Sequence, residues 1–179
     1  GAFDISVLPL VKLWGFGTEN AHVPAPAEIE EALGYVNYSK IELNGSSVKL
    51  GEGMSITLGA IAKGYASQEL SDMLKSRGIE SAILSLGGNV QAVGSKPDGS
   101  KWRVALRDPR NTEAYAGIFE ISDMAAVTSG GYERYFEQDG KTYHHILDPK
   151  TGYPAESGLI SVTILCEDGT KADALSTAL

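Results

Sequence analysis

Short apolar runs separated by glycine-bearing turns are the feature that most limits what this chain can fold into. Asn44-Gly45 lies between the runs 41–43 and 48–50, and Asp139-Gly140 lies within a second pattern of this kind that starts at residue 132. An Asn-Gly or Asp-Gly pair between two β-prone runs predicts a β-hairpin. Because hairpins join antiparallel strands, these turns disfavour a doubly wound parallel sheet.

The remaining segments alternate irregularly between helix and strand patterns. Apolar spacing predicts helices over residues 4–14, 24–36 and 60–76, and a last helix that begins near residue 171. Strands are predicted over residues 54–59, 81–86, 90–93, 102–106, 114–121, 125–127 and 159–165. An irregular order of helices around central hairpins favours an α+β fold.

The predicted helix 60–76 is a candidate phosphate-binding element. It follows a turn at Gly59 and carries Lys63 in its first turn, and free N–H groups beside a cation suit a pyrophosphate. The segment has neither the spacing of a Walker loop nor a GxGxxG fingerprint, so the signal is not specific. The apolar residues expected to form its buried face are Ile61, Tyr65, Leu70, Met73 and Leu74.

Composition limits the classes of partner. At 179 residues the chain is long enough for one domain with a sizeable core. Its formal net charge of −8 argues against a nucleic acid or an anionic membrane as partner. The same charge means that a phosphate-bearing ligand would need local cations or a bound metal. The single cysteine, Cys166, excludes an intrachain disulfide and a thiolate metal cluster.

Neither end of the sequence carries the signals of a natural boundary. The chain starts directly in the amphipathic segment 4–14 and stops at Leu179, inside an apolar helical pattern without a stop signal. No apolar run approaches the roughly 20 residues of a membrane span, and no signal peptide is visible. We therefore expect residues 1–179 to be a single domain that is truncated at both ends.

Residues 144–154 concentrate the most chemistry. The segment reads His-His-Ile-Leu-Asp-Pro-Lys-Thr-Gly-Tyr-Pro, and its histidines are expected where a strand runs into a tight turn. Pro149 keeps Asp148 out of the α region, and Gly152 allows the turn to close with a positive φ. The histidines either supply a general base at an active site or only finish a hairpin, and the residues alone leave both interpretations open.

A second candidate site lies on the last predicted helix. Asp173 and Thr177 are four residues apart and therefore share a face of that helix. Both offer the oxygen ligands that Mg²⁺ prefers. The apolar residues 174–175 and 178–179 place the pair at the edge of a buried surface, where a metal would satisfy the carboxylate. The alternative is an exposed polar pair with no ligand.

Three glycine-bearing segments could admit a ligand against the backbone. The segment Trp14-Gly15-Phe16-Gly17 either stacks on a planar ring system or ends a helix with its aromatic side chains in the core, and composition favours the core. Gly87-Gly88-Asn89 forms an open turn after a predicted strand. Residues 128–130 combine hydroxyls and a glycine at the end of another strand.

Six segments of the chain, taken together, resemble one known family. They are residues 3–17, 58–66, 85–89, 128–130, 145–152 and 172–178. In this order they resemble the ApbE family, the flavin transferases historically misnamed thiamine biosynthesis lipoproteins. The resemblance spans nearly the whole chain and implies an α+β, T-fold-like architecture of mixed and antiparallel sheets with packed helices.

The resemblance implies FAD:protein FMN transferase activity. Such enzymes bind FAD with Mg²⁺ and move FMN onto a threonine hydroxyl of a partner flavoprotein, such as a subunit of a membrane redox complex, with release of AMP. Some relatives instead, or also, hydrolyse FAD to FMN and AMP, and a flavin-binding module without turnover is a third alternative. An extracytoplasmic location is also implied, in the periplasm or on the outer face of the inner membrane, often with a lipid anchor.

The motifs also imply roles for particular residues. The metal ligands would be the Ala60 carbonyl, Asp173 and Thr177, and the catalytic residues would be Asp173 and His145, the latter as general base. The implied FAD contacts are Trp14, Gly15, Phe16, Thr57, Lys63, Gly87, Gly88, Asn89, Thr128, Ser129, Gly130 and Leu147. Two of these segments depart from the family pattern. Thr57 stands where relatives usually carry aspartate, and Ser176 replaces a second acidic metal ligand of some members.

Overall fold

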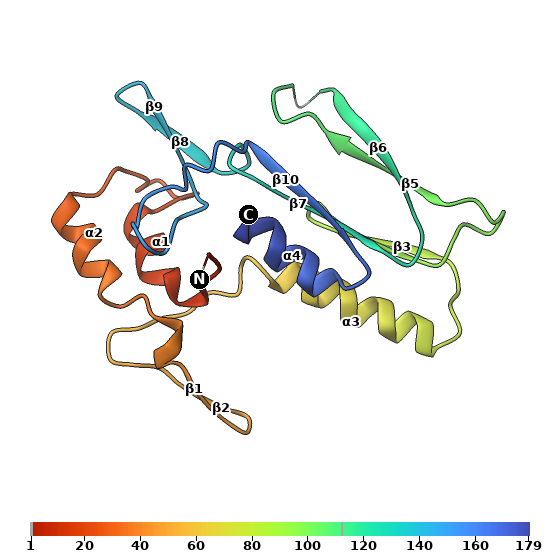
Figure 1. Cartoon of the computed structure of the whole chain (residues 1–179), viewed down its shortest axis with the longest axis horizontal. Helices are drawn as coiled ribbons and strands as arrows, with labels where there is room; N and C mark the ends of the chain where they lie inside the picture. Colours follow the sequence, from red (N-terminus) through yellow and green to blue (C-terminus); the bar gives the residue numbers. More distant parts are fainter. Residues whose placement is uncertain (1, 112) are drawn as a thin grey trace. The chain divides into compact units, whose positions relative to one another are not determined.

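The computed structural model describes residues 2–111 and 113–179, which form two compact units (Figure 1). Unit 1 contains the described residues up to Leu58 together with Gly131–Gly158. Unit 2 contains Gly59–Gly130, apart from residue 112, together with Leu159–Leu179. Each unit is therefore built from two separate stretches of the chain.

Unit 1 begins with short helices. They are the 3-10 helix η1 (Ile5–Val7), α1 (Leu8–Trp14), α2 (Pro26–Leu33) and the 3-10 helix η2 (Tyr38–Lys40). The Asp4 carboxylate accepts the Ser6 N–H at 2.9 Å and so starts the first helical segment. Gly15, at φ 65°, ends α1 in the left-handed conformation that glycine adopts without strain. Both helices predicted for this region are confirmed, although α2 is shorter than the predicted segment 24–36.

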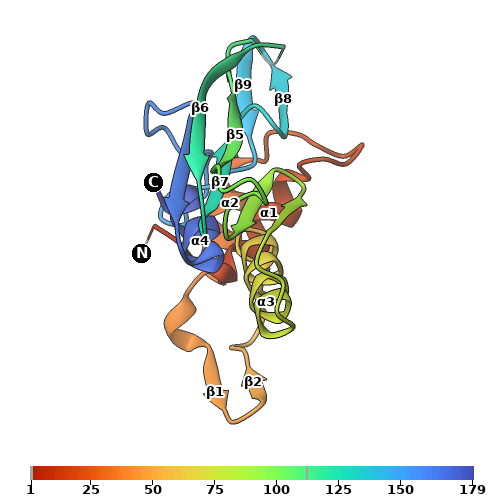
Figure 2. The same cartoon turned by 90° about the vertical axis from the view of Figure 1, so that its right-hand side faces the viewer.

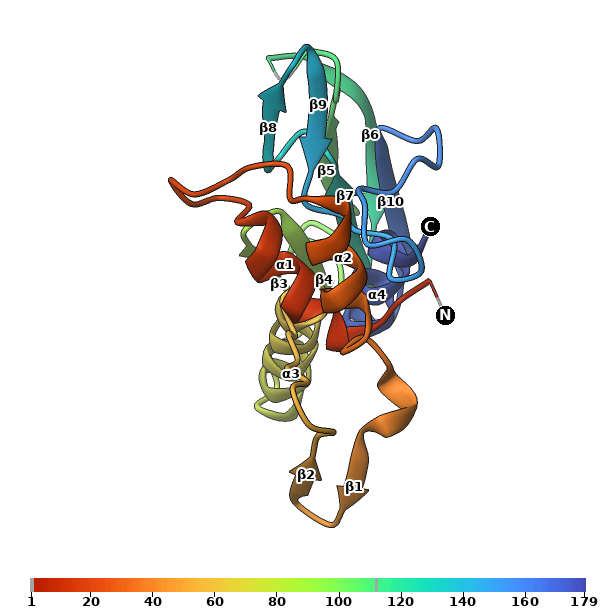
Figure 3. The same ribbon diagram turned by 90° about the vertical axis from the view of Figure 1, so that its left-hand side faces the viewer.

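Two hairpins complete unit 1, and both were predicted from their turns. The strands are β1 (Glu42–Asn44), β2 (Ser47–Lys49), β8 (Tyr135–Gln138) and β9 (Lys141–His144). Asp139 and Gly140 have φ values of 53° and 75°, the paired positive values of a type I′ turn. Within unit 1, the β1–β2 hairpin extends away from α1 and α2 (Figure 3). The second hairpin turns at the predicted Asp139-Gly140 pair, whereas the first turns at residues 45–46, because Asn44 is the last residue of β1.

Unit 2 is built on an antiparallel sheet of four strands in the order β10-β7-β4-β3. Its strands are β3 (Ala82–Leu86), β4 (Asn89–Val93), β7 (Ala125–Gly130) and β10 (Ser161–Cys166). The other elements are α3 (Ala62–Ser76), α4 (Gly169–Ala178) and the hairpin of β5 (Trp102–Arg107) and β6 (Tyr115–Ile121). Helices α3 and α4 lie side by side (Figures 1 and 2).

Alternate residues of β7 face two different cores in unit 2. Ala125 and Val127 pack with Ala172 of α4 on the helical face of the sheet. Ala126 packs with Ala92 and Ile121 on the face that the β5–β6 hairpin contacts. The sheet is therefore covered by helices on one face and by a hairpin on the other. Among the described residues, no helix is long and apolar enough to cross a membrane.

The strand predicted over residues 54–59 is wrong. This segment has no regular secondary structure. The Thr57 N–H donates to the Ile5 carbonyl at 2.8 Å, and no ladder of such bonds appears along the described segment. A strand requires a partner along its length, and an apolar run cannot specify one that lies far away in the sequence.

The predicted buried face of α3 is also wrong. Tyr65 and Met73 are 56% and 40% exposed, whereas the buried residues of the helix are Gly64, Ser67 and Ser71. These small residues are spaced at i, i+3 and i+7, so they share one face. Small side chains face inward here because α3 lies very close to α4.

Helix α4 likewise differs from its prediction. It begins at Gly169 rather than near residue 171, because Asp168 caps it. Leu175 and Leu179 are 46% and 62% exposed, whereas Asp173 is only 2% exposed. The carboxylate therefore lies on the buried face of the helix and not at the edge of an apolar surface.

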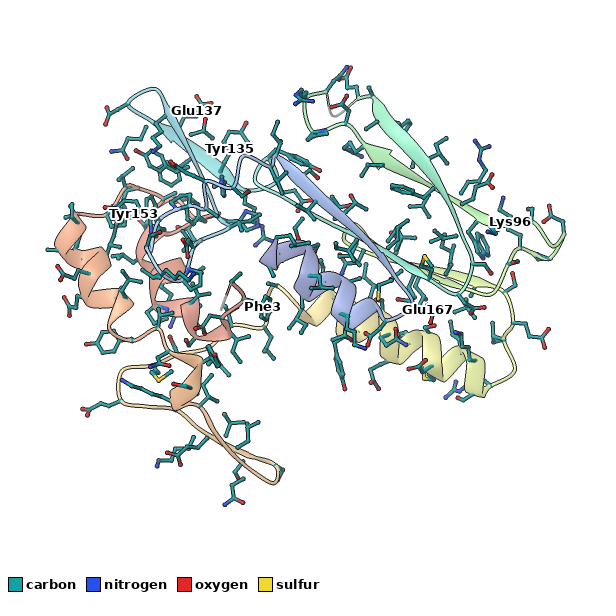
Figure 4. The ribbon with its side chains drawn as sticks, in the orientation of Figure 1. Phe3, Lys96, Tyr135, Glu137, Tyr153 and Glu167 are labelled. Carbon is teal, nitrogen blue, oxygen red and sulfur yellow. The ribbon has the colours of Figure 1, made fainter. Side chains whose placement is uncertain are left out.

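Replacing Asp168 with alanine is expected to destabilise α4 in a pH-dependent manner. Asp168 follows Glu167 in the turn before α4 (Figure 4), and its carboxylate accepts the Lys171 N–H at 3.0 Å. That hydrogen bond, assisted by the Lys171 charge, lowers the pKa of Asp168. A depressed pKa stabilises the fold above the ordinary aspartate value of about 3.9, and this contribution disappears as the pH falls further.

Urea unfolding at pH 7 should give a loss of about 1 kcal/mol for Asp168→Ala. The loss should be smaller at pH 3, where the wild-type carboxylate begins to take up its proton. Asp168→Asn keeps an acceptor oxygen and is the matched control, with a smaller loss at pH 7. An equal loss for the alanine variant at both pH values would contradict the assignment of a charged cap.

Candidate functional site

Two glycines allow α3 and α4 to approach each other closely. A Cβ atom added at Gly64 would overlap the Gly169 carbonyl and come within 2.5 Å of the Asp173 Cβ. A Cβ atom added at Gly169 would come within 3.1 Å of the Ser67 Oγ. The space at this crossing is therefore already filled, and the close approach brings the Asp173 side chain against the first turn of α3.

The Asp173 carboxylate caps α3 from the neighbouring helix. Its Oδ2 accepts the Gly64 N–H at 2.7 Å, and Ile61, at the N-cap position of α3, makes no side-chain cap. The first N–H groups of a helix have no partner within the helix, so a buried carboxylate is well placed there. Within the described ranges, Oδ1 makes no hydrogen bond.

The same hydrogen bond leaves the Ala60 carbonyl available. In an uninterrupted helix this carbonyl would accept the Gly64 N–H, which donates to Asp173 instead. No N–H group in the described part of the chain replaces it. Ala60 and Asp173 thus contribute two oxygen acceptors near the start of α3.

Hydroxyl groups surround Asp173 on α4 and β7. The Ser129 Oγ lies 2.8 Å from the Ser176 Oγ and 3.2 Å from the Thr177 Oγ1. Ser176 is 3% exposed, and its hydroxyl donates to the Asp173 backbone carbonyl at 2.9 Å. The neighbouring Thr128 faces the other side of the sheet and contacts the Thr163 Oγ1 at 2.8 Å.

A lysine and an open turn lie in the same unit. Gly87 and Gly88, with φ values of 53° and 94°, connect β3 to β4. A Cβ atom at Gly87 would lie 3.6 Å from the Lys63 Cδ, so the lysine side chain runs past the turn. Asn89 is 1% exposed, and its Nδ2 finds no partner among the described residues. This arrangement suits a phosphate group, as the sequence predicted for Lys63.

The oxygen groups of unit 2 fit Mg²⁺ better than a softer metal. Asp173, Thr177 and Ala60 offer a carboxylate, a hydroxyl and a carbonyl, and Mg²⁺ binds to such oxygens while keeping several waters. No group of three or more histidine, cysteine, aspartate or glutamate side chains could hold a metal in the residues that the structure covers. A transition-metal centre therefore lacks its usual ligands there.

In unit 1, the aromatic side chains after α1 belong to the core. Trp14 is fully buried and stacks on Phe16 with 5.5 Å between ring centroids and 10° between planes. Phe136 and Tyr143 continue the cluster, and Tyr153 (Figure 4) meets Trp14 edge-on at 5.9 Å. The core interpretation that composition favoured is confirmed for Trp14. Phe16 is half-buried and keeps part of its ring exposed.

The same tryptophan fixes the histidine-bearing loop. Its indole N–H donates to the Gly152 carbonyl at 2.8 Å in a buried position. Gly152 has φ 76°, and its N–H closes the turn onto the Asp148 carbonyl at 2.8 Å, as the sequence predicted. Leu147 packs against the core cluster of Trp14. The loop is thus held by buried contacts on both its backbone and its side chains.

The hydrogen bonds of His145 indicate which ring nitrogen carries a proton. Its Nδ1 lies 3.2 Å from the Arg134 carbonyl, and its backbone N–H donates to the same oxygen at 3.1 Å. A carbonyl only accepts, so the Nδ1–H of His145 is the donor in this contact. His144 instead points its Nε2 to the Ala155 carbonyl at 3.1 Å. The two adjacent histidines therefore differ in their surroundings.

The residues implied by the sequence divide between the two units. Unit 1 contains Trp14, Gly15, Phe16, Thr57, His145 and Leu147. Unit 2 contains the others, which are Ala60, Lys63, Gly87, Gly88, Asn89, Thr128, Ser129, Gly130, Asp173 and Thr177. Sequence reasoning missed the Gly64 N–H as the partner of Asp173. The available signal was Ile61, a residue without a capping side chain at the start of a helix.

The fold and the oxygen-rich crossing of α3 and α4 define an α+β protein with a candidate site for a hard cation and an open glycine turn in the same unit. The model of the ApbE family matches residues 1–179. The chain belongs to the ApbE family.

Named relatives and solved structures agree with this assignment. The chain is 39% identical over 195 residues to the FAD:protein FMN transferase of Treponema pallidum, covering 99% of this chain and 54% of the relative. It is 41% identical over 182 residues to that of Klebsiella pneumoniae, covering 99% of this chain and 56% of the relative. The chain thus spans about half the length of the curated relatives that it matches.

Two crystal structures match the fold. The ApbE protein of Thermotoga maritima superposes with a TM-score of 0.92 at 43% identity, covering 99% of this chain and 59% of that one. The apo form of the flavinyl transferase ApbE of Pseudomonas stutzeri superposes with a TM-score of 0.87 at 38% identity. That match covers 99% of this chain and 56% of the other. These matches confirm the predicted α+β, ApbE-like fold.

Proposed function

We propose that this chain serves in the transfer of FMN from FAD to a threonine hydroxyl of a partner flavoprotein, a reaction that depends on Mg²⁺ and releases AMP. The observation that carries the proposal is the buried Asp173 carboxylate, which is bonded to the Gly64 N–H and lies on one helix with Thr177. It supports a cation site in a chain whose relatives are named FAD:protein FMN transferase.

Unit 2 would provide the binding of the charged substrate. Asp173, Thr177 and the Ala60 carbonyl would hold Mg²⁺, which when bound neutralises charge on the pyrophosphate. Lys63 would add a positive charge beside the glycine turn after β3. A chain of net charge −8 would repel a dianionic pyrophosphate. The cation and Lys63 would offset this repulsion at the site.

His145 would act as the general base. Its Nε2 would take the proton of the acceptor threonine hydroxyl. The threonine oxygen would then attack the phosphorus atom on the FMN side of the pyrophosphate. As that bond forms, the bond from this phosphorus to the bridging oxygen breaks, and AMP leaves with the electron pair. The Trp14–Gly152 hydrogen bond would keep the loop of His145 in place.

The acceptor and the location are part of the same proposal and rest on the family resemblance. We propose a flavoprotein with an accessible threonine as acceptor, such as a subunit of a membrane redox complex. We also propose an extracytoplasmic site of action, in the periplasm or on the outer face of the inner membrane, with a lipid anchor. Fractionation of cells that express the full-length protein tests the location, because recovery in the cytoplasm would contradict it.

A transfer assay tests the reaction. The protein is incubated with FAD, Mg²⁺ and an acceptor domain that carries a target threonine, and the acceptor is analysed by in-gel fluorescence and mass spectrometry. The expected product is an acceptor heavier by FMN less one water, together with AMP, and chelation of Mg²⁺ should abolish both. An acceptor with valine in place of the target threonine is the matched control.

The same assay distinguishes the alternatives. Release of AMP and FMN without any acceptor would indicate an FAD pyrophosphatase, in which water replaces the threonine as nucleophile. Binding of FAD with neither product would indicate a flavin-binding module without turnover. With a competent acceptor present, free FMN and AMP without any flavinylated acceptor, or FAD binding with neither product, would reject the transferase proposal.

A further inference from the structure

Three hydroxyl groups beside Asp173 have a preferred order of donation. The Asp173 backbone carbonyl only accepts, so the 2.9 Å contact makes the Ser176 hydroxyl its donor. Because the single hydroxyl proton of Ser176 is already donated, its Oγ accepts from the Ser129 hydroxyl at 2.8 Å. The Ser129 Oγ in turn accepts from the Thr177 hydroxyl at 3.2 Å. Each proton is used once along this chain of hydroxyls.

The opposite order fits the distances less well. It would require the Thr177 hydroxyl to donate to the Asp173 carbonyl at 3.4 Å, the longest contact of the cluster. It would also leave the 2.9 Å contact between the Ser176 Oγ and that carbonyl without its proton. The shorter set of contacts therefore directs the Thr177 proton toward Ser129.

We propose that Ser129 and Ser176 are positioning residues that turn the Thr177 proton inward and leave both lone pairs of its Oγ1 for a divalent cation. A hydroxyl binds a cation through a lone pair, and a proton pointing at the cation would repel it. The proposal deepens the proposed function, because it rests on the same Mg²⁺ site. It also gives the buried Ser176 a role of its own.

The burial of the cluster supports a fixed order. Ser176 is 3% exposed, and Ser129 and Thr177 are half-buried at the contact between β7 and α4. Water competes poorly for hydroxyls in such a position, so the protein contacts determine where each proton points. Mutation of a group that orients a metal ligand typically costs about 10–100-fold in metal affinity.

Cation affinity, measured without FAD, tests the proposal. Isothermal titration with Mg²⁺ and electron paramagnetic resonance with Mn²⁺ are applied to the wild type and to Ser129→Ala, Ser176→Ala and Thr177→Val. Both serine variants should bind about tenfold or more weakly, since this is the usual effect of losing an orienting partner. Ser129→Thr keeps the hydroxyl and should retain most of the wild-type affinity.

Thr163→Val is the matched control. It breaks the contact between the Thr128 and Thr163 hydroxyls, which joins β7 to β10 and has the same 2.8 Å separation as the Ser129–Ser176 contact. Urea unfolding of every variant separates lost affinity from lost folding, and the threonine variant supplies a comparison if an alanine variant unfolds. Serine variants that bind like Thr163→Val, while Thr177→Val binds weakly, would overturn the inference and leave the cation site standing. A wild type that binds neither ion would overturn the cation site itself.

Discussion

Replacing His145 with alanine is expected to lower the rate of FMN transfer by about 10²–10⁴-fold, the usual contribution of a positioned general base. The Nδ1–H of His145 donates to the Arg134 carbonyl, and we propose that Nε2 takes the proton of the acceptor threonine. A general base acts only in its deprotonated form, so the wild-type rate should rise with pH. The variant should lose both the rate and that rise with pH.

The measurement is the initial rate of acceptor flavinylation across pH 5 to 9, with the affinity for FAD determined separately. His22→Ala is the matched control, because His22 is an exposed histidine whose Nδ1 lies 2.8 Å from the Asn20 carbonyl. Its rate and pH profile should match those of the wild type. A His145→Ala enzyme with an unchanged rate would show that another group removes the proton, whatever the family of the chain.

Replacing Gly64 with alanine is expected to give the largest loss of stability in unit 2. Alanine is the better helix former by about 1 kcal/mol, so propensity alone predicts a gain. The added Cβ atom would, however, collide with the backbone of Gly169 and with the Asp173 Cβ. Neither of these can rotate aside, and overpacking of this kind should lower the free energy of unfolding by about 3 kcal/mol.

Gly64→Ala should also impair cation binding, because separating α3 from α4 breaks the hydrogen bond from the Gly64 N–H to the Asp173 Oδ2. Urea unfolding and Mg²⁺ titration measure the two effects. Gly117→Ala is the matched control, since a Cβ atom at Gly117 meets nothing within 4 Å. A Gly64→Ala protein as stable as the Gly117→Ala protein would mean that the two helices are not in close contact at this crossing.

Local chemistry in the sequence was sufficient for the hairpins and turns. Asn44-Gly45 and Asp139-Gly140 predicted the two hairpins of unit 1, and both hairpins are present, the first with its turn at residues 45–46. Gly152 predicted a turn with a positive φ after the histidines, and its φ is 76°. Each of these features depends on residues a few positions apart, so the sequence carries all the information that is needed.

Non-local features were not predictable in this way. The apolar run 54–59 has the composition of a strand, yet it has no regular secondary structure. The apolar pattern of α3 indicated that Tyr65 and Met73 would be buried, but the helix buries Gly64, Ser67 and Ser71 instead. Amphipathicity predicts which side chains avoid water, but it does not reveal how closely a second helix will approach.

The sequence by itself determined the family, the antiparallel α+β architecture and the candidate residues, because these depend on ordered motifs and short-range turn chemistry. Only the tertiary structure decided that Asp173 is a buried cap of another helix and that the Ser129 hydroxyl contacts those of both Ser176 and Thr177. The physical reason is close packing. Gly64 and Gly169 are 105 positions apart in the sequence. Because neither has a side chain, nothing separates α3 from α4 where they cross.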